Sequence, residues 1–319
     1  MSDYRFIDRL TRNPVAERSA LIANLTAGRA SIPPKYFYDA VGCALFGAIC
    51  ELPEYYPTRT ERAIFTRYRD EIAAAVGCGR QFVDLGAGDC SKAESWLPVL
   101  APARYVAVDI AGDALARALA RLAPEFPTLE LTGIVADFTE GLDLTRDLGD
   151  TPATFFYPGS SIGNFASDDA RRFLEDIRRH CAPGSGAGLL IGADTRKDPR
   201  RLKAAYDDAP GVTAAFNRNV LRHVNRVVDA DFDPASFDHL AFFDERAGRV
   251  EMHLVAGRRQ TVRIGEAHRT FEDGETIHTE CSYKYAPEEF TALLASAGFA
   301  QVRCWQDDAG DFAVYFAAP

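Results

Sequence analysis

The chain has 319 residues, 47% of them hydrophobic, which suffices for one large or two modest cores. Its 46 acidic residues outnumber its 36 basic ones, and the net charge of −10 argues against nucleic acid or an anionic membrane as the main partner. The N-terminus lacks the apolar core of a signal peptide, and no apolar run approaches the roughly 18 residues of a transmembrane helix, so we expect a cytoplasmic protein.

Cysteine and histidine usage argues against several kinds of site. The seven scattered cysteines include no C-x-x-C pair, which predicts reduced thiols rather than a disulfide framework or a zinc site. The six histidines likewise show no metal-binding spacing. We therefore expect no metal. We also expect a monomer that binds a small-molecule substrate.

The first 60 residues show no regular alternation of strands and helices. They contain two motifs dense in tyrosine and proline, at Ile32–Gly42 and Leu52–Glu61. Tyrosines in such motifs can pack tightly and also offer a hydroxyl group to a polar ligand. The alternative is a rigid loop, held by its aromatic side chains, that only covers the domain.

Residues 61–195 alternate short apolar runs with helical patterns. The predicted strands are 81–85, 104–109, 128–135, 154–157 and 188–192, and the predicted helices are 62–75, 91–100, 113–122 and 168–180. This alternation predicts a parallel sheet with helices on both faces, whose ligands bind beyond the C-terminal ends of the strands.

A glycine motif follows the first of these strands. Residues 83–92 read VDLGAGDCSK, and a second apolar run ends in Asp109, 21 residues after Gly88. Glycine lets a ligand approach the backbone closely, here at Gly86 and Gly88. An acid about 20 residues further on can accept both hydroxyls of a ribose. The pattern predicts a nucleoside-containing cofactor, and the alternative is an ordinary tight turn.

The residues around the glycines indicate which cofactor. NAD sites carry a third glycine and face a pyrophosphate, whereas Ser91 stands at the third position here. Asp84 and Asp89 flank the glycines and would repel a pyrophosphate, but they suit a cationic ligand without phosphate. S-adenosylmethionine carries a sulfonium, an ammonium and a carboxylate, and Lys92 could pair with that carboxylate.

A third signal is the pair Asp137–Phe138, which follows the apolar run 129–135. An acid beside an aromatic ring at a strand end can hydrogen-bond the adenine amino group and cover the face of the ring. The alternative is an ordinary strand end followed by a helix cap.

Residues 196–284 depart again from the alternation. A charged run at 196–201 precedes helical stretches at 203–208 and 212–228 and strands near 239–244, 249–257, 260–264 and 276–285. Together with residues 1–60 they predict a second domain, inserted before the final helix. Residues 285–319 complete the first domain with a helix at 287–297 and a hairpin of strands 301–306 and 312–317.

Several short blocks together resemble one family. They are the two tyrosine-rich motifs, GSSIGN at 159–164, AYDD at 205–208, GVTAAFNRN at 211–219 and TECS at 279–282. From residue 32 to the turn at 310–312, the chain is similar to the histidine Nα-methyltransferases of ergothioneine biosynthesis. The resemblance implies an enzyme that transfers three methyl groups from S-adenosylmethionine to the α-amino group of L-histidine, giving hercynine.

The pattern and the resemblance agree on the architecture. We expect an α/β, Rossmann-like class I methyltransferase fold with a second, smaller α+β substrate domain. Residues 61–195 and 285–319 would bind S-adenosylmethionine, and residues 1–60 and 196–284 would bind the substrate. A hairpin added to the end of a parallel sheet is typical of Rossmann-like methyltransferases, although a fold-level analogy says little about the substrate.

The resemblance also implies site residues. The imidazole would be held by Tyr38, Glu280 and Ser282, and the amino and carboxylate groups by Tyr55, Asn164 and Tyr206. The junction between the two ligands would be lined by Gly159. The cofactor would be bound by Gly86, Gly88, Lys92, Asp109, Asp137 and Phe138. The catalytic roles would belong to Asn164 and Tyr38.

The chain departs from the family's pattern in two places. The family is richer in Thr, Ser and Glu where this chain has Asp89-Cys90-Ser91, and it has tryptophan where this chain has Tyr36. The first change affects how the methionine part of the cofactor is held. The second keeps an aromatic side chain.

Glu280 and Ser282 give the resemblance a chemical basis. In an extended run, residues two apart point to the same face, where a carboxylate and a hydroxyl could meet the two ring nitrogens of an imidazole. Glu280 accepts from a ring N–H, and Ser282 can donate or accept. An apolar amino acid would leave Glu280 unpaired at a cost, which favours histidine. The alternative is a strand with a solvated polar face.

Neighbouring residues receive plainer interpretations. Met252 could form an apolar wall of the amino-acid pocket, as its place in the family suggests, or belong to the ordinary core. His253 and His278 are expected to be structural. Cys281 is expected to point away from Glu280 and Ser282, into the core.

Three other functions stay open. The first is an N-methyltransferase of the same fold that acts on another aromatic amino acid; an indole, however, offers one donor and no acceptor to Glu280 and Ser282. The second is a regulatory subunit that binds S-adenosylmethionine without catalysis. The third is an NAD-linked oxidoreductase, disfavoured by the missing third glycine and the flanking acids.

Overall fold

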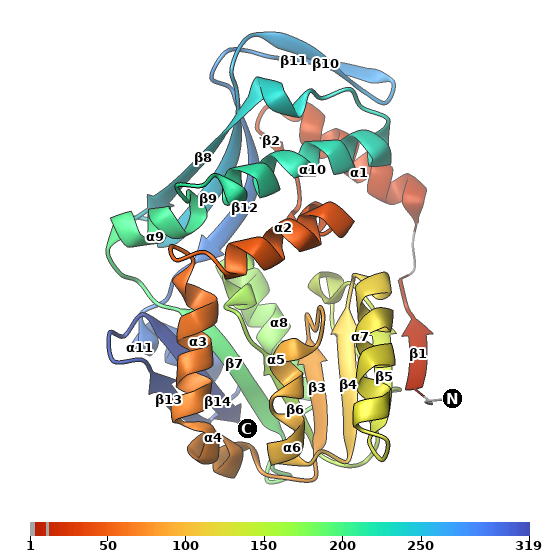
Figure 1. Cartoon of the computed structure of the whole chain (residues 1–319), viewed down its shortest axis with the longest axis vertical. Coiled ribbons are helices and arrows are strands. Elements are labelled where there is room, and N and C mark those ends of the chain that lie inside the picture. Colours follow the sequence, from red (N-terminus) through yellow and green to blue (C-terminus); the bar gives the residue numbers. More distant parts are fainter. Residues whose placement is uncertain (1–3, 11–12) are drawn as a thin grey trace. The chain divides into compact units, whose positions relative to one another are not determined.

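The computed structural model describes residues 4–10 and 13–319. The chain forms two compact units, each built from more than one segment (Figure 1). Unit 1 comprises residues 4–10, 59–195 and 285–319, and unit 2 comprises residues 13–58 and 196–284. Within the described residues, no helix combines the length and the apolar character needed to cross a membrane.

Unit 1 is built on an eight-stranded sheet in the order β1-β5-β4-β3-β6-β7-β14-β13. The pairs from β1 to β7 are parallel, and the terminal hairpin of β13 and β14 joins β7 antiparallel. The strands are β1 (Tyr4–Asp8), β3 (Gln81–Leu85), β4 (Arg104–Asp109), β5 (Glu130–Val135), β6 (Ala153–Tyr157), β7 (Gly188–Asp194), β13 (Gln301–Gln306) and β14 (Phe312–Ala318).

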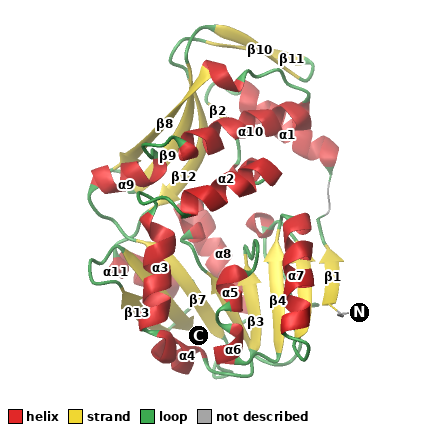
Figure 2. Ribbon diagram, viewed as in Figure 1, coloured by secondary structure: helices red, strands yellow, loops and turns green. Residues whose placement is uncertain are grey.

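Helices cover both faces of this sheet (Figure 2). One face packs against α8 (Ser167–Arg179) and α11 (Pro287–Ser296). The other packs against α3 (Tyr56–Arg67), α4 (Arg69–Val76), α5 (Ser91–Glu94), α6 (Leu97–Leu100) and α7 (Gly112–Glu125). Successive strand residues alternate between the two cores, as Phe82 and Val83 do. The α/β, Rossmann-like class I methyltransferase fold expected from the sequence is confirmed.

Two predicted helices of unit 1 are each interrupted. The helix expected over 62–75 is divided at Tyr68, whose backbone φ of −106° and ψ of 20° separate α3 from α4. The helix expected over 91–100 is divided into α5 and α6. Pro98 explains the second break, because proline lacks the N–H that a helix interior needs and is tolerated in the first turn, where it lies in α6.

One domain assignment was wrong at its N-terminal end. Residues 4–8 do not belong with the rest of 1–60, since β1 pairs in parallel with β5 at the edge of the unit 1 sheet, from Tyr4 opposite Leu131 to Asp8 opposite Val135. The predictions for residues 1–3 and 11–12 concern positions outside the described residues. A single edge strand, far in sequence from its partner, leaves no local signal of the sheet that it joins.

Unit 2 contains a four-stranded sheet in the order β2-β12-β9-β8 and a two-stranded sheet of β10 and β11. Its strands are β2 (Ala30–Ser31), β8 (Phe237–Asp244), β9 (Arg249–Ala256), β10 (Gln260–Ile264), β11 (Ala267–Phe271) and β12 (Thr276–Tyr283). Its helices are α1 (Pro14–Thr26), α2 (Ala40–Cys50), α9 (Pro199–Tyr206) and α10 (Val212–Val228), with short 3-10 turns η1 (Pro34–Phe37) and η4 (Pro234–Ser236).

The long helix α10 anchors the core of unit 2. Its buried side chains, among them Phe216 and Val220, belong to one apolar cluster with Met252 and Leu254 of β9 and Ile277 of β12. Helix α10 and strand β10 have the bounds predicted from the sequence. Strand β11 and helices α1 and α2 were not predicted, because their apolar residues follow neither a clear helical nor a clear alternating pattern.

Candidate cofactor and amino-acid sites

The loop after β3 has the backbone geometry that its glycines permit. Gly86 and Gly88 have φ values of 71° and 54°, a region that side chains with a Cβ disfavour. The N–H groups of Gly86 and Ala87 donate to the carbonyl oxygen of Val108, at 2.9 and 3.1 Å. These bonds hold the loop against the C-terminal end of β4, at the edge where the sequence predicted a ligand.

Asp109 lies at the end of β4, and both of its carboxylate oxygens are held by the backbone. Oδ2 accepts from the N–H of Gly88 at 2.8 Å, and Oδ1 accepts from the N–H of Ala111 at 2.7 Å. Each carboxylate oxygen can accept a further hydrogen bond. The structure thus brings together the glycine and the acid that the spacing of 21 residues had linked.

Asp84 is buried beneath the same loop. Its side chain accepts from the hydroxyl of Tyr105 at 2.8 Å. Burial raises the pKa of Asp84 to about 7, against the opposing effect of that hydrogen bond. With its residue only 2% exposed, Asp84 supports the loop from inside unit 1.

Phe138 faces the glycine loop from the next strand end. A Cβ placed on Gly86 would lie 3.8 Å from Phe138 Cζ and 3.9 Å from Tyr157 Cε2, so the backbone of Gly86 and these two rings approach closely. The rings of Phe138 and Tyr157 meet edge to face at 5.9 Å. Asp137 directly precedes Phe138 and caps the start of η2 (Phe138–Glu140), where its side chain accepts from the N–H of Thr139 at 3.1 Å.

A buried glutamate, which the sequence did not single out, joins Lys92 to the turn after β6. Glu61 Oε2 pairs with Lys92 Nζ at 2.7 Å, and Glu61 Oε1 accepts from the N–H of Gly159 at 2.7 Å. The side chain of Glu61 is 1% exposed, so both ends of this bridge depend on a desolvated carboxylate. Its only sequence signal was its position as the last residue of the second tyrosine-rich motif.

The turn after β6 has an unusual backbone. Gly159 and Ser160 both have positive φ, at 81° and 59°. Ser160 Oγ accepts from the N–H of Asp194 at 2.9 Å, which supports the strained serine. The turn leads into η3 (Ser161–Asn164), where Asn164 is half-buried as the last residue. All of the cofactor residues expected from the sequence, with Gly159 and Asn164, therefore lie at the ends of strands of unit 1 or in the turns and short helices that follow them.

Glu280 and Ser282, two of the three residues expected to hold the imidazole, lie on one buried face of unit 2, beyond a β-bulge. The pairing of β12 with β9 shifts register between His278 and Glu280, leaving Thr279 as the extra residue. Beyond the bulge, Glu280 is opposite Met252 and Ser282 is opposite Val250. Both polar residues are buried on the side of the apolar core. The solvated polar face considered for this strand was wrong.

Ser282 belongs to a buried network with Tyr206 and Lys284. The hydroxyl of Tyr206 donates to Ser282 Oγ at 2.8 Å. Lys284 Nζ donates to the Tyr206 hydroxyl and to Ser282 Oγ, each at 2.9 Å. Lys284 is 1% exposed. Sequence reasoning missed this lysine, which continues the same face of the strand two residues after Ser282.

Glu280 lies near Lys284 and near Tyr55. Burial raises its pKa to about 7, and the charge of Lys284 opposes that rise. Burial, then the influence of Tyr206, Cys50, Glu280 and Tyr38, holds the pKa of the Tyr55 hydroxyl well above its usual range. Tyr55 also meets the ring of Tyr206 at 6.3 Å. Tyr38 packs on Phe46 at 6.0 Å, next to Tyr55 in the same cluster. The structure thus brings Tyr38, Tyr206 and Glu280 together around Tyr55.

Asn217 fixes the back of this face. Its side-chain amide donates to His239 Nδ1 at 2.9 Å and to the carbonyl oxygen of His253 at 3.0 Å, and it accepts from Thr279 at 2.8 Å. It therefore ties α10 to β8, β9 and the bulge residue. Met252 is 2% exposed and opposite Glu280, as both of its sequence interpretations allow.

The opposite face of β9 and β12 carries a separate polar network. Glu251 pairs with Arg249 and with His253, whose Nε2 lies 2.9 Å from Glu251 Oε2. His278 Nε2 lies 3.2 Å from Cys281 Sγ, since the bulge turns these two residues to one side. Cys281 was correctly expected to point away from Glu280, but it is half-buried in this network and not in the core.

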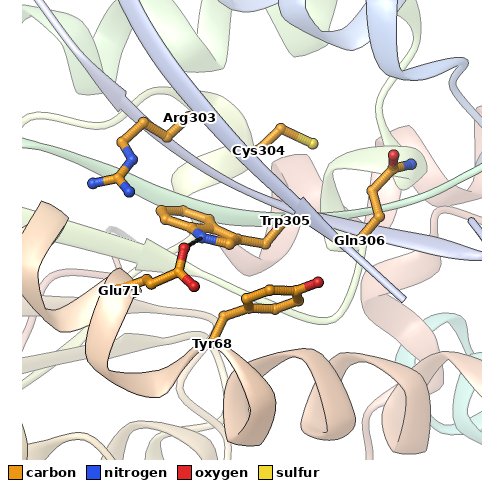
Figure 3. A pocket seen from close by; sticks show the side chains of 6 residues that line it. All are labelled: Tyr68, Glu71, Arg303, Cys304, Trp305 and Gln306. Carbon is orange, nitrogen blue, oxygen red and sulfur yellow. Dashed lines mark hydrogen bonds between the residues drawn. The ribbon is translucent and has the colours of Figure 1, made fainter. Parts of the chain in front are cut away.

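Unit 1 also has a surface pocket (Figure 3). It is lined by Tyr68, Glu71, Arg303, Cys304, Trp305 and Gln306. Trp305 donates to Glu71 at 3.2 Å, and the Arg303 guanidinium lies over the indole ring at 5.1 Å. None of the residues predicted for cofactor or substrate takes part in it.

Comparison with known proteins places this geometry in a family. The model of the S-adenosylmethionine-dependent, histidine-specific methyltransferases matches residues 17–319. A histidine N-α-methyltransferase of Mycolicibacterium smegmatis is 42% identical over 95% of this chain and 94% of its own length. That of Mycobacterium tuberculosis is 39% identical over 95% of both chains. The ergothioneine biosynthesis protein 1 of Neurospora crassa is 31% identical over 87% of this chain and 32% of its own length. The chain therefore belongs to the S-adenosylmethionine-dependent, histidine-specific methyltransferases.

Proposed function

We propose that this protein transfers three methyl groups from S-adenosylmethionine to the α-amino group of L-histidine and releases hercynine, a step of ergothioneine biosynthesis. The observation that carries the proposal is the buried pair of Glu280 and Ser282 on one face of β12. A carboxylate and a hydroxyl side by side fit the two nitrogens of an imidazole. The family to which the chain belongs supports the same substrate.

The cofactor would be bound by unit 1. The loop at Gly86 and Gly88 leaves room for a ligand, since a Cβ on Gly88 would meet no other described atom within 4 Å. Asp109 has acceptor capacity left for a ribose, and Asp137 and Phe138 would hold the adenine. Lys92 would pair with the methionine carboxylate while Glu61 keeps the lysine oriented. These residues fit a nucleoside that carries a carboxylate and no phosphate.

The substrate would be bound by residues of unit 2, and the resemblance to the family assigns roles in substrate binding to Gly159 and Asn164 as well. Glu280, Ser282 and Tyr38 would hold the imidazole, with Met252 as an apolar wall. Tyr55, Tyr206 and Asn164 would hold the amino and carboxylate groups. Contacts at the imidazole and the carboxylate would keep histidine in place while its amine gains one, two and then three methyl groups.

S-adenosylmethionine supplies a methyl group on a sulfonium, so the protein's part is orientation and electrostatics. Each of the three transfers would form one C–N bond and break the C–S bond of the methyl group, and the nitrogen would lose one proton before each attack. The amine must be neutral to attack, and a neighbouring positive charge favours that form. Asn164 can hydrogen-bond and aim the amine but cannot act as a base, so the proton would leave to water. Tyr38 would assist by holding the ring.

Two alternatives make different predictions. A methyltransferase for another aromatic amino acid would bind tryptophan in preference to histidine, although an indole leaves one of Glu280 and Ser282 unpaired. A regulatory subunit would bind S-adenosylmethionine without turnover. An NAD-linked oxidoreductase lacks support from the family.

The decisive experiment incubates the purified chain with histidine and S-adenosylmethionine and follows the products by mass spectrometry. Histidine carrying one, two and finally three methyl groups supports the proposal. Binding of S-adenosylmethionine without methylated histidine would leave only the regulatory subunit, and methylation of tryptophan alone would indicate the other substrate. Replacing Asn164 with alanine should lower kcat and change the proportions of the three products, and unchanged values would remove Asn164 from the mechanism.

We further propose that the protein acts as a cytoplasmic monomer whose partner is histidine, without nucleic acid or membrane. The net charge of −10 supports this reading. Light scattering at enzymatic concentrations, together with cell fractionation, would test it, and a dimer or a membrane-bound fraction would overturn it.

A further inference from the structure

Three buried side chains of unit 2 form a chain of hydrogen bonds in which the donor and the acceptor of each bond can be assigned. Lys284 donates to the hydroxyl of Tyr206 and to Ser282 Oγ, and Tyr206 donates to Ser282 Oγ. A protonated lysine has three donors and no acceptor, so it can stand only at the head of such a chain. Glu280, a buried carboxylate on the same face, supplies a counter-charge for a protonated amine at this position.

The direction of the remaining bond follows from the capacity of a hydroxyl. Ser282 Oγ accepts two hydrogen bonds, from Lys284 at 2.9 Å and from Tyr206 at 2.8 Å. A serine hydroxyl has two acceptor lone pairs and one hydrogen, so only its hydrogen is left for a ligand. The phenol of Tyr206 is also the more acidic of the two hydroxyls and hence the better donor. In this arrangement Ser282 meets a ligand as a donor.

Glu280, on the same face, has the complementary role. Its ionised carboxylate can only accept. A ligand between Glu280 and Ser282 must therefore offer one N–H donor and one bare nitrogen acceptor. Neutral imidazole has that pair, whereas imidazolium has two donors and indole or pyrrole has one donor and no acceptor.

We propose that Lys284 is a specificity-determining residue, which fixes Ser282 as a hydrogen-bond donor and thereby selects a neutral imidazole in a single tautomer. The inference rests on the proposed function, in which Glu280 and Ser282 hold the imidazole. It adds a residue that does not touch the substrate but sets the direction of the hydrogen bond between Ser282 and the substrate. Lys284 is thus a positioning residue, acting through Ser282 and Tyr206.

Substrate analogues that lack the acceptor nitrogen of the ring test the donor role of Ser282 directly. The two β-(pyrrolyl)alanine isomers keep one ring N–H but replace the other nitrogen with C–H. The wild-type protein should prefer histidine over either isomer by roughly 10- to 100-fold in kcat/KM, because the Ser282 hydrogen would be left buried without an acceptor. In Lys284→Met the serine can turn its hydrogen toward Tyr206, so the preference should fall below about threefold.

The matched control is Lys203→Met, since Lys203 lies on α9 of the same unit with its side chain 54% exposed. It should keep the wild-type preference. Thermal unfolding and the Kd for S-adenosylmethionine would verify that Lys284→Met is folded. If wild type prefers histidine and Lys284→Met prefers it equally, the role of Lys284 is wrong while the proposed function stands. If wild type shows no methylation of histidine, the proposed function itself fails.

A second measurement needs no variant. Histidine labelled with ¹⁵N in its ring, bound to the wild-type protein with S-adenosylhomocysteine, should show one protonated and one bare ring nitrogen across pH 7 to 8. Two protonated nitrogens would mean that Ser282 accepts from the ring, and the proposed direction of the chain would be wrong. This readout decides the question even if Lys284→Met does not fold.

Discussion

The two candidate sites are held in different ways. In unit 1, backbone groups position the functional side chains, as the N–H groups of Gly88 and Ala111 do for Asp109. In unit 2, side chains position one another, since Ser282 is held by Tyr206 and Lys284. A site built on backbone depends on local sequence, which fixes a turn and its glycines. A site built on side-chain networks depends on residues that meet only after folding. Substitution of any one of these residues can disrupt the site.

The largest effect should come from removing the acceptor of the unit 2 site. We expect Glu280→Ala to lower kcat/KM for histidine by roughly 100- to 1,000-fold, because a charged hydrogen bond to the ring N–H is lost and no other acceptor replaces it. The Kd for S-adenosylmethionine, measured by calorimetry, should be unchanged. An equal loss of cofactor affinity would mean that the cofactor site of unit 1 and the substrate site of unit 2 are not held independently.

Glu61 is the corresponding test in unit 1, because it positions Lys92 through a side-chain ion pair and not through the backbone. Glu61→Ala would leave Lys92 and the N–H of Gly159 without their shared carboxylate. We expect the KM for S-adenosylmethionine to rise roughly 10- to 100-fold, with a smaller change in kcat. Glu61→Gln keeps an acceptor for Gly159 but loses the ion pair, so its KM should lie between those of alanine and wild type.

A matched control for Glu61 is Glu71→Ala. Glu71 lies in the same unit and accepts from Trp305 in the surface pocket. Its removal should leave both KM values at their wild-type level. If Glu71→Ala raised the KM for S-adenosylmethionine as much as Glu61→Ala, the effect would reflect general damage to unit 1.

The pH dependence of histidine binding should follow Glu280. Burial raises the pKa of Glu280 to about 7 in the free protein. The ionised form is the acceptor for the ring N–H, so bound histidine favours ionisation and lowers this pKa. Affinity should therefore increase as pH rises through 7, by up to about tenfold per pH unit below it, and binding near pH 7 should release a proton. Calorimetry in buffers of different ionisation enthalpy measures that proton, and Glu280→Gln should abolish the part of the release that Glu280 contributes.

The same contrast explains what the sequence could predict. Gly86, Gly88 and Asp109 were found from spacing, because a strand, a turn and the next strand are consecutive in the chain. Glu280 and Ser282 were placed on one face correctly, since two residues beyond a bulge still alternate. The bulge at Thr279, which brings His278 and Cys281 to a single face, has no local signature. Glu61 was missed because Lys92 is 31 residues away in sequence. Lys284 was missed because Tyr206, which shares Ser282 with it, is 78 residues away.

The smallest effect on activity should come from the face of β9 that carries His253, opposite the face that carries Met252. This prediction tests where the substrate site of unit 2 ends. His253 bonds Glu251 and stacks on Phe242 at 5.5 Å, on the side of β9 opposite Met252. We expect His253→Ala to destabilise the protein by about 1–2 kcal/mol, since one hydrogen bond and one ring contact are lost. Thermal unfolding measures that loss, and kcat/KM for histidine should stay within about twofold of wild type when assayed well below the melting temperature. A larger loss of activity would mean that the network of Glu251, His253 and His278 reaches through the sheet to Glu280, and the division between a catalytic face and a supporting face would then have to be abandoned.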